Sequence, residues 1–343
     1  MVSMEAEMIQ TNFDPSREGF HFDNGTFKGT WSVFCGGMTY AALDYRKYKV
    51  KLPGLTKAPA EGNPLQEYLY SRQATAHFYT WHKFVPTAFV PVVPIIGPIV
   101  GAVASPLVQG SCEDLESYLS SQGPVVIGLR KDGGGHHVLA IGCDAAKQTI
   151  DLYDNNHHDK RSQLTLKNDK WIHSNSTTQW AGWFFDWGHY SDGARFPPLS
   201  WRYCTKCHGL FTDSFERVNR CAAGGTHSAN QDFEYFLPWS KTQGEGDGER
   251  GWRLCGKCMC LFFSPSGQPT GYCADGQNHI PATKSGILLA FSVRDSGNPG
   301  EKMWFKCNLC FGLFWAGNGN GTCDVGGTHE KSNNQYAVDH RTA

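Results

Sequence analysis

Trp201-Arg-Tyr-Cys204-Thr-Lys-Cys207 opens a pattern that returns as Trp252-Arg-Leu-Cys255-Gly-Lys-Cys258 and again as Trp304-Phe-Lys-Cys307-Asn-Leu-Cys310. The three tryptophans are 51 and 52 residues apart, and a Leu-Phe pair follows each Cys-x-x-Cys turn. A third cysteine then precedes a histidine by six positions in every copy. Because self-similarity at a fixed period marks a repeat architecture, residues 201–343 are predicted to contain three copies of one unit.

The recurring side chains of each copy have the spacing of a metal site, C-x2-C-x(12–14)-C-x5-H. Three thiolates and one imidazole complete the tetrahedral shell of a structural zinc ion, which leaves no open position for chemistry. Disulfides are the alternative, but they would leave one thiol over in each copy and the histidines unexplained. We predict three zinc ions, held by Cys204, Cys207, Cys221 and His227, by Cys255, Cys258, Cys273 and His279, and by Cys307, Cys310, Cys323 and His329. Cys260 lies outside this register and is expected to be a small core residue.

Short apolar runs at 233–237, 287–291 and 336–338 have the composition of a closing strand in each copy. Repeats of this size cannot bury their own aromatic side chains, so three of them are expected to share one core. We predict an all-β domain of repeats at about 201–251, 252–303 and 304–343, closed with pseudo-threefold symmetry as in a β-trefoil. A linear array of zinc ribbons is the competing arrangement.

The segment resembles the Trp-x-x-Cys-x-x-Cys-x-x-Leu-Phe repeat modules that are appended to many bacterial and secreted proteins, over about residues 201–340. Appended trefoil-like modules are commonly lectins. The resemblance therefore implies a glycan ligand, which the spacing by itself does not indicate.

The first 195 residues show a different pattern, which begins at Cys35-Gly36-Gly37. The residues after these glycines have helical spacing, so Cys35 is placed where a turn enters a helix and the helix N-terminus favours its thiolate. A short helix capped by Ser111 follows, and Gly123-Pro124 ends it. Strands are then predicted at 125–129, 136–142 and 150–153.

This order of elements resembles that of papain-like cysteine peptidases, over most of residues 30–190. The resemblance implies an α+β domain in which Cys35 is the nucleophile, with a protein or peptide as substrate. Papain-like domains place the catalytic histidine before an apolar string that ends in glycine, and counting back from Gly142 selects His136 over His137. Asp154, with Asn155 as the alternate, would then orient the imidazole.

One feature of papain-like peptidases is missing from the sequence. They carry a glutamine about six residues before the cysteine, where this chain has Gly29. The backbone N–H of Cys35 is therefore expected to donate to the oxyanion, and its side-chain partner is unassigned. Cys112 and Cys143 fit no catalytic role and are expected in the core, and the run 157–159 (His-His-Asp) is expected in a solvated loop rather than at a metal.

Residues 84–107 are uncharged and contain five prolines. The length admits a membrane span, but interior prolines disfavour a straight helix. We expect an extended insertion that covers part of the peptidase-like domain. A segment that contacts membranes or a partner on a trigger, as in a toxin, and a transmembrane helix are the alternatives.

Composition limits the remaining functional classes. The net charge of −1 gives no indication of a nucleic-acid partner. No standard signal peptide is predicted at residues 1–10, which leaves cytoplasmic location and non-classical release both open.

The two patterns predict two domains, 1–195 and 201–343, joined by a proline-containing linker at 195–200. This layout is similar to that of chimerolectins, which implies a cysteine peptidase delivered by a glycan-binding module, as a defence protein or toxin. One alternative is a non-enzymatic toxin that acts on membranes through residues 84–107. Another is a regulatory protein that binds a protein partner through its zinc repeats.

Overall fold

The computed structural model describes residues 8–24, 34–60, 63–84, 110–132, 134–217, 219–237, 249–284, 287–288, 290–295 and 300–342. The chain folds as two compact units, one of residues 1–47 with 68–195 and the other of residues 48–67 with 196–343. The stretch 48–67 belongs with the repeats because its backbone bonds to them. The N–H of Lys51 donates to the carbonyl oxygen of Ser214 (2.8 Å), and that of Gly54 donates to Oε1 of Glu234 (3.0 Å).

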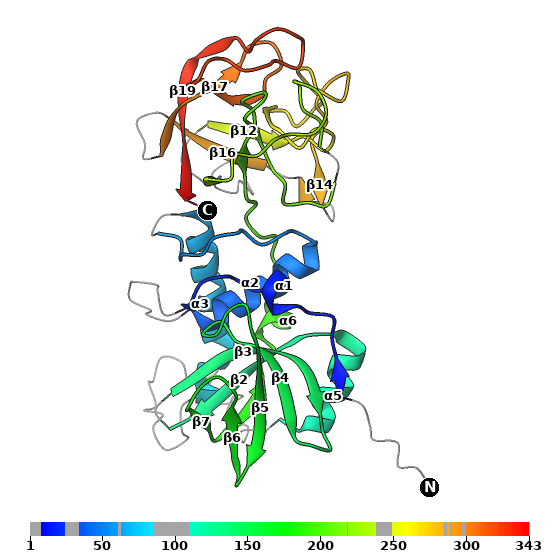
Figure 1. Ribbon diagram of the computed structural model, residues 1–343, viewed down its shortest axis with the longest axis vertical. Helices are drawn as coiled ribbons and strands as arrows, with labels where there is room; N and C mark the ends of the chain where they lie inside the picture. The colour runs from blue at the N-terminus through cyan, green and yellow to red at the C-terminus, as the bar shows by residue number, and fades with distance from the viewer. Residues whose placement is uncertain are drawn as a thin grey trace, which may run out of the picture. The chain divides into compact units, whose positions relative to one another are not determined.

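The first unit is a curled antiparallel sheet with few helices (Figure 1). Its helices are α1 (Pro15–Glu18), α2 (Cys35–Tyr48), α3 (Pro64–Phe84), α5 (Cys112–Gln122) and α6 (Gly188–Asp192). Its strands are β1 (Ile9–Gln10), β2 (Val125–Lys131), β3 (Gly134–Asp144), β4 (Thr149–Tyr153), β5 (Arg161–Lys167), β6 (Lys170–His173), β7 (Gln179–Trp180) and β8 (Gly182–Phe185). The strand order is β7-β6-β5-β4-β3-β2-β8, and β1 also pairs with β3.

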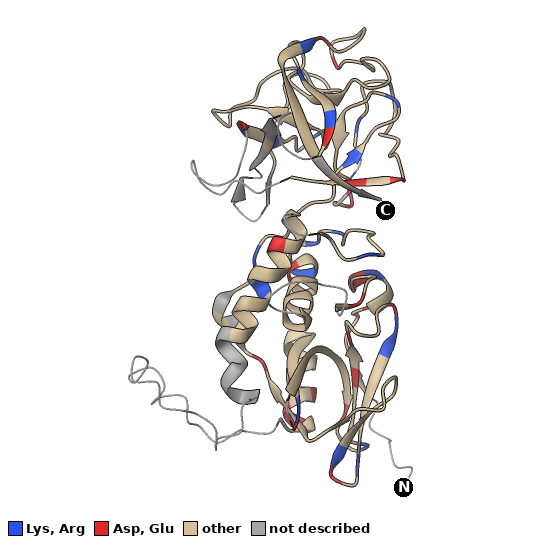
Figure 2. Ribbon diagram, turned by 90° about the vertical axis from the view of Figure 1, so that its left-hand side faces the viewer, with Lys and Arg blue, Asp and Glu red and all other residues tan. Residues whose placement is uncertain are grey.

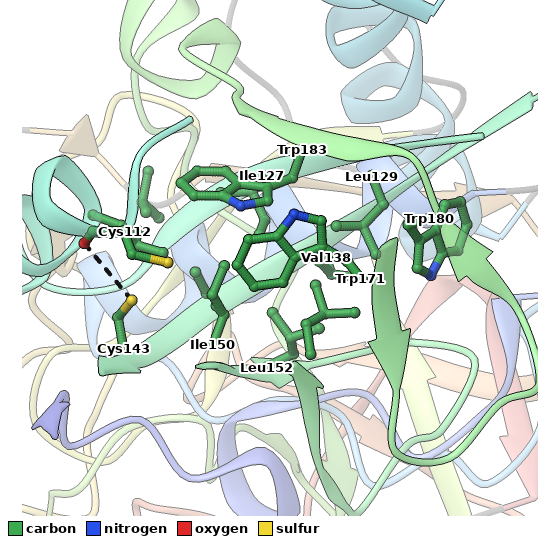
Figure 3. Packing of buried hydrophobic residues seen from close by; sticks show 14 of the residues in the cluster. Cys112, Ile127, Leu129, Val138, Cys143, Ile150, Leu152, Trp171, Trp180 and Trp183 are labelled. Atoms are coloured by element: carbon green, nitrogen blue, oxygen red, sulfur yellow. Dashed lines mark hydrogen bonds between the residues drawn. The ribbon is translucent and has the colours of Figure 1, made fainter. Parts of the chain in front are cut away.

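The two faces of β3 belong to two hydrophobic clusters, as strand alternation requires. Val138 and Ala140 pack with residues of α5 and with Trp171 and Trp183, and Figure 3 shows Val138 clustered with the two tryptophans. The same cluster buries both thiols that the sequence analysis placed in the core, Cys112 and Cys143. Leu139 and Ile141 face the other way, onto Tyr40 and Ala42 of α2. Helix α2 therefore covers one face of the sheet and α5 the other.

Helix α3 packs closely on the beginning of α2 because two glycines stand there. A Cβ atom on Gly37 would lie 2.3 Å from the carbonyl oxygen of Leu69, and one on Gly36 would lie 2.6 Å from the Cβ of Ala76. About two turns further along α2, the buried Asp44 accepts hydrogen bonds from Arg72 of α3, at 2.6 Å to Nε and 2.7 Å to Nη2. A buried bidentate pair of this kind fixes the angle between two helices as well as their spacing.

The second unit is all-β among its described residues after residue 200. Its strands are β9 (Arg202–Tyr203), β10 (Leu210–Phe211), β11 (Phe233–Phe236), β12 (Glu249–Leu254), β13 (Leu261–Phe263), β14 (Thr283–Lys284), β15 (Ile287–Leu288), β16 (Ala290–Asp295), β17 (Glu301–Cys307), β18 (Leu313–Trp315) and β19 (Lys331–Thr342). Strands β13-β12-β16-β19-β17-β18 form one sheet in that order, with β11 also on β19. The β9–β10 and β14–β15 pairs are two-stranded.

The three repeats are joined in a closed ring by equivalent backbone hydrogen bonds. In each, the residue after the Leu-Phe pair donates to the residue after the second cysteine of the next repeat: Thr212 to Met259 (3.0 Å), Phe263 to Phe311 (2.9 Å) and Trp315 to His208 (3.0 Å). The three accepting residues have left-handed φ angles of 65°, 67° and 66°. The third repeat thus bonds back to the first, which a linear array of zinc ribbons cannot do.

The tryptophans on which the repeats align are the centre of this unit. Trp201, Trp252 and Trp304 are all fully buried. Tyr235 and Tyr336 from the predicted closing strands pack edge-on against Trp304 and Trp252, with ring centroids 5.3 and 5.4 Å apart. Such contacts are favourable beyond the burial of area. Aromatic contacts therefore join the third repeat to the first and to the second.

Figure 2 shows acidic and basic residues interspersed over both units, in keeping with the net charge of −1. Among the described residues, no helix is long and apolar enough to span a membrane. The segment 84–107 lies outside the described residues except for Phe84, where α3 ends.

Candidate active site and metal centres

Cys35 is the first residue of α2, as the sequence analysis predicted, and its side chain is buried. The free N–H groups of a first helical turn carry a partial positive charge that stabilises a nearby thiolate. One of them, on Gly37, donates to Oε1 of Gln73 of α3 (2.7 Å).

His136 meets the carboxylate that the sequence analysis assigned to it. Its Nε2 lies 2.7 Å from Oδ1 of Asp154, directly after β4, and both side chains are buried. Burial favours the neutral imidazole. The charge and hydrogen bond of Asp154, and after them those of Cys35, outweigh burial and raise the pKa of His136 to about 10. Burial likewise opposes the charge on Asp154, but His136 and then His173 hold the pKa of that carboxyl well below its ordinary value.

His137 also reaches the cysteine. Its Nδ1 lies 3.9 Å from Sγ of Cys35, and its Nε2 lies 3.0 Å from Oδ2 of Asp186, directly after β8. Burial would raise the pKa of the Cys35 thiol. Hydrogen bonds and charge from His136, and next from His137, instead lower that pKa well below its ordinary value. The site is therefore built to hold a thiolate beside imidazolium.

Asn155, the alternate to Asp154, points elsewhere. Its Nδ2 donates to the carbonyl oxygen of Cys35 (2.9 Å) and to Oγ1 of Thr39 (3.0 Å). It thus ties the end of β4 to the first turn of α2, so that the amide positions the helix that carries the cysteine.

Two further histidines surround Asp154. Nε2 of His173 lies 3.0 Å from Oδ2 of Asp154, and His157 is close enough that the three side chains could hold a metal ion. However, Nδ1 of His173 accepts the N–H of Asn175 (3.1 Å), so its proton belongs on Nε2, directed at the carboxylate. This tautomer suits a hydrogen-bonded array and blocks the nitrogen that a metal would need.

Residues 85–171 match the family model described as papain-like cysteine protease AvrRpt2. The matched segment contains β2 to β5, with His136, His137 and Asp154, and begins after Cys35. It supports a peptidase-type domain in this part of the chain. Searches of curated proteins and of solved structures found no match.

The oxyanion partner sought upstream of Cys35 falls on residues 25–33, which lie outside the described residues. Asp186 and His173 had no sequence signal of their own. Asp186 follows the aromatic strand β8, and His173 is the last residue of the short strand β6. Only the pairing of strands in the sheet brings these two residues to the site.

The three Cys3His sets each converge, and their ligand atoms lie within 4.8 Å of one another. The first and third cysteine sulfurs are 3.8, 3.9 and 3.7 Å apart in the three sets. The second cysteine sulfur is 3.5 Å from the histidine Nδ1 in each. Zn–S bonds of ~2.3 Å and Zn–N bonds of ~2.0–2.1 Å at tetrahedral angles give about 3.8 and 3.5 Å. The sets fit a zinc-sized ion, whereas a disulfide requires sulfurs ~2.05 Å apart.

Each ligand histidine also makes a contact beyond its own repeat. Nε2 of His227 lies 3.3 Å from Sγ of Cys260, that of His279 lies 3.4 Å from Oδ2 of Asp324, and that of His329 lies 3.1 Å from the carbonyl oxygen of Cys207. A metal-bound imidazole usually donates its other ring N–H to an acceptor, and these contacts place such an acceptor near each Nε2. Cys260, expected only as a core residue, thus contacts the histidine of the first Cys3His set.

The glycan ligand, the toxin role and the membrane contact remain predictions of the sequence. Neither the family match nor the described residues bear on them.

Proposed function

We propose that the first unit is a papain-like cysteine peptidase in which Cys35 is the nucleophile, His136 is the general base and acid, and Asp154 orients His136. The observation that carries the proposal is the position of Cys35 at the start of α2 together with the buried pair of His136 and Asp154, whose Nε2 and Oδ1 atoms are 2.7 Å apart. In keeping with it, His136 lowers the pKa of the Cys35 thiol. Pairs of titratable groups whose pKa values are driven apart in this way are typical of acid–base sites.

The proposed reaction is acyl transfer. The thiolate of Cys35 attacks the peptide carbonyl carbon, the C–N bond breaks, and the amine leaves with the proton of His136. A water molecule then gives a proton to His136 while its oxygen attacks the thioester carbon. The C–S bond breaks, the acid product leaves, and the thiolate returns beside imidazolium. The backbone N–H of Cys35 is proposed as an oxyanion donor.

The test is cleavage of a peptide library by the full chain and by Cys35→Ala. Loss of cleavage in Cys35→Ala, with cleavage retained in Cys143→Ala, is the expected result. Cys143 is a matched control because it is equally buried but lies in the cluster under α5. Equal cleavage by Cys35→Ala would refute the proposal and favour the non-enzymatic alternative.

We further infer that the three Cys3His sets hold zinc and that these ions are structural. Zinc would supply folding free energy to this unit, and its cysteine ligands would lose their protons on binding. Backbone N–H groups already point at three ligand sulfurs: Lys257 at Cys255 and Asp275 at Cys273 (both 3.5 Å), and Leu309 at Cys307 (3.4 Å). Elemental analysis of the purified chain should find three equivalents of zinc, and fewer than two would refute this assignment.

The proposed layout is a peptidase domain within 1–195, without the stretch 48–67 that packs with the repeats, and a trefoil-like zinc domain over 201–343. The family match supports the first part, and the closed ring of repeats supports the second. A closed shell of four protein ligands offers no position for substrate, so all chemistry is proposed for the first unit.

A further inference from the structure

A second imidazole–carboxylate pair lies against Cys35 and is not used in the reaction proposed above. His137 directs Nδ1 at Sγ of Cys35 (3.9 Å) and Nε2 at Oδ2 of Asp186 (3.0 Å). One ring nitrogen on the sulfur and the other on a carboxylate is the relation that activates a cysteine nucleophile.

The sheet explains why His137 faces the cysteine. His137 lies on the same side of β3 as Leu139 and Ile141, which pack on α2. Its partner across the β2–β3 pair is Gly128, and a Cβ there would lie 2.2 Å from the ring of Phe184. The glycine thus leaves room for an aromatic ring beside the imidazole.

Asp186 is held rigidly enough to orient that imidazole. It is fully buried, and its N–H donates to the carbonyl oxygen of Val126 (2.9 Å). Its Oδ1 accepts the N–H of Gly188 (2.8 Å), which leaves Oδ2 for His137. A buried carboxylate is costly unless it is paired, so this placement calls for a cation opposite it.

The other titratable groups around His137 leave it as the cation. Burial, followed by the charge of His137, lowers the pKa of His77 on α3. Burial, followed by the charge of Asp186, raises the pKa of Tyr40 on α2, so the phenol stays neutral. Arg72 lies over the Tyr40 ring and is paired with Asp44, and His136 adjoins His137 in β3 with Asp154 as its own partner.

We propose that His137 is a second catalytic residue, a permanent imidazolium that Asp186 orients and that stabilises the Cys35 thiolate while His136 carries the proton. This inference rests on the proposed peptidase function. In the steps above, the proton shuttles between His136 and either the leaving amine or water, and His137 keeps its proton throughout. His136 is neutral only while the sulfur is held in the thioester, so the free thiolate lies beside two imidazolium rings, of which only that of His137 keeps its proton throughout the cycle.

The decisive measurement is the pH dependence of Cys35 alkylation by iodoacetamide, followed by peptide mapping, which needs no turnover. His137→Gln should shift the alkylation midpoint upward by one pH unit or more and lower kcat at least tenfold, with little change in KM. Asp186→Asn should reproduce both effects, because the amide keeps the Oδ1 acceptor for Gly188 but loses the negative charge. Circular dichroism checks that each variant folds.

His136→Gln separates the two histidines. It should abolish peptide cleavage while Cys35 still alkylates at acid pH. An unshifted alkylation midpoint in folded His137→Gln would overturn the proposal, and so would cleavage that survives His136→Gln but not His137→Gln. Failure of the peptidase function itself has a different signature, namely cleavage that persists in Cys35→Ala.

Discussion

Nδ2 of Asn155 lies 2.9 Å from the carbonyl oxygen of Cys35, so the end of β4 is bonded to the residue that begins α2. The adjacent residue, Asp154, holds His136. One dipeptide therefore fixes both the helix that carries the nucleophile and the imidazole that serves it, and this coupling has a direct consequence for mutation.

Asn155→Ala should lower stability and activity together. The substitution leaves the buried Oγ1 of Thr39 and the carbonyl oxygen of Cys35 with one hydrogen bond fewer each, at a cost of about 1–3 kcal/mol. Urea unfolding measures the stability, and peptide cleavage the activity. Asn155→Asp is the matched variant. It keeps the shape of the side chain but places a carboxylate oxygen, instead of the donating Nδ2, against the carbonyl oxygen of Cys35. Full activity in Asn155→Asp would contradict the assigned role.

The pH dependence of Cys35 reactivity follows from the pKa shifts. Because the pKa of Cys35 is lowered, its alkylation should reach a plateau well below the ~8.5 at which an ordinary thiol ionises. The pKa of His136 is raised to about 10, so the imidazolium that protonates the leaving amine should persist until the pH rises through about 10. The pKa of His137 is raised to about 9, so peptide cleavage should begin to fall as the pH rises through about 9 and should be lost above about 10. A midpoint for Cys35 alkylation at or above that of free cysteine would count against the site.

The same shift predicts a stability effect with a defined sign. The folded pKa of His136 lies above the unfolded value of ~6.5, so its contribution to folding is complete below that pH and disappears as the pH rises through about 10. His136→Gln should therefore cost more stability at pH 6 than at pH 10. Denaturant midpoints at the two pH values measure the difference, and an equal loss at both would be evidence against the ion pair.

Gly37→Ala should be strongly destabilising. Its new Cβ would lie 2.3 Å from the carbonyl oxygen of Leu69, a backbone atom that moves only if α3 moves, and overpacking of this kind costs about 1–3 kcal/mol or more. Gly134→Ala is the matched control, because no atom lies within 4 Å of its added Cβ. Thermal unfolding of both variants tests the prediction, which fails if their midpoints agree.

Cys258→Ser should remove one zinc ion and loosen the ring of repeats. The next residue, Met259, accepts the N–H of Thr212 from the first repeat, so a disordered turn there would release a neighbour as well. Native mass spectrometry should count two zinc ions in this variant. Cys260→Ser, a change outside the ligand sets, should keep three. Three ions in Cys258→Ser would contradict the assigned ligands.

Features that depend on local pattern could be predicted from the sequence. The spacing of Met38, Ala41 and Tyr45 predicted α2, and Ser111 caps α5 through a hydrogen bond from the N–H of Asp114 (3.0 Å). The repeats predicted convergent Cys3His sets because every ligand lies within one short unit. In each case the interactions that determine the structure join residues within a few tens of positions of one another.

The features that could not be predicted in this way depend on pairing between distant segments. Asp186 meets His137 only because β8 pairs with β2 and β2 with β3. Strand alternation would let only one of His136 and His137 face α2, whereas in the structure both histidines act on the Cys35 thiol. The stretch 48–67 has no motif, and only backbone bonds such as Lys51 to Ser214 assign it to the second unit.

The central claim is that Cys35 is the nucleophile of the first unit, and covalent labelling tests it most directly. The full chain with its zinc retained would be incubated at pH 6 with a peptidyl vinyl sulfone, which traps activated cysteines, and analysed by intact mass and peptide mapping. We predict a single adduct, located on Cys35 and absent from Cys35→Ala. No adduct, or equal labelling of Cys112 and Cys143, would contradict the account.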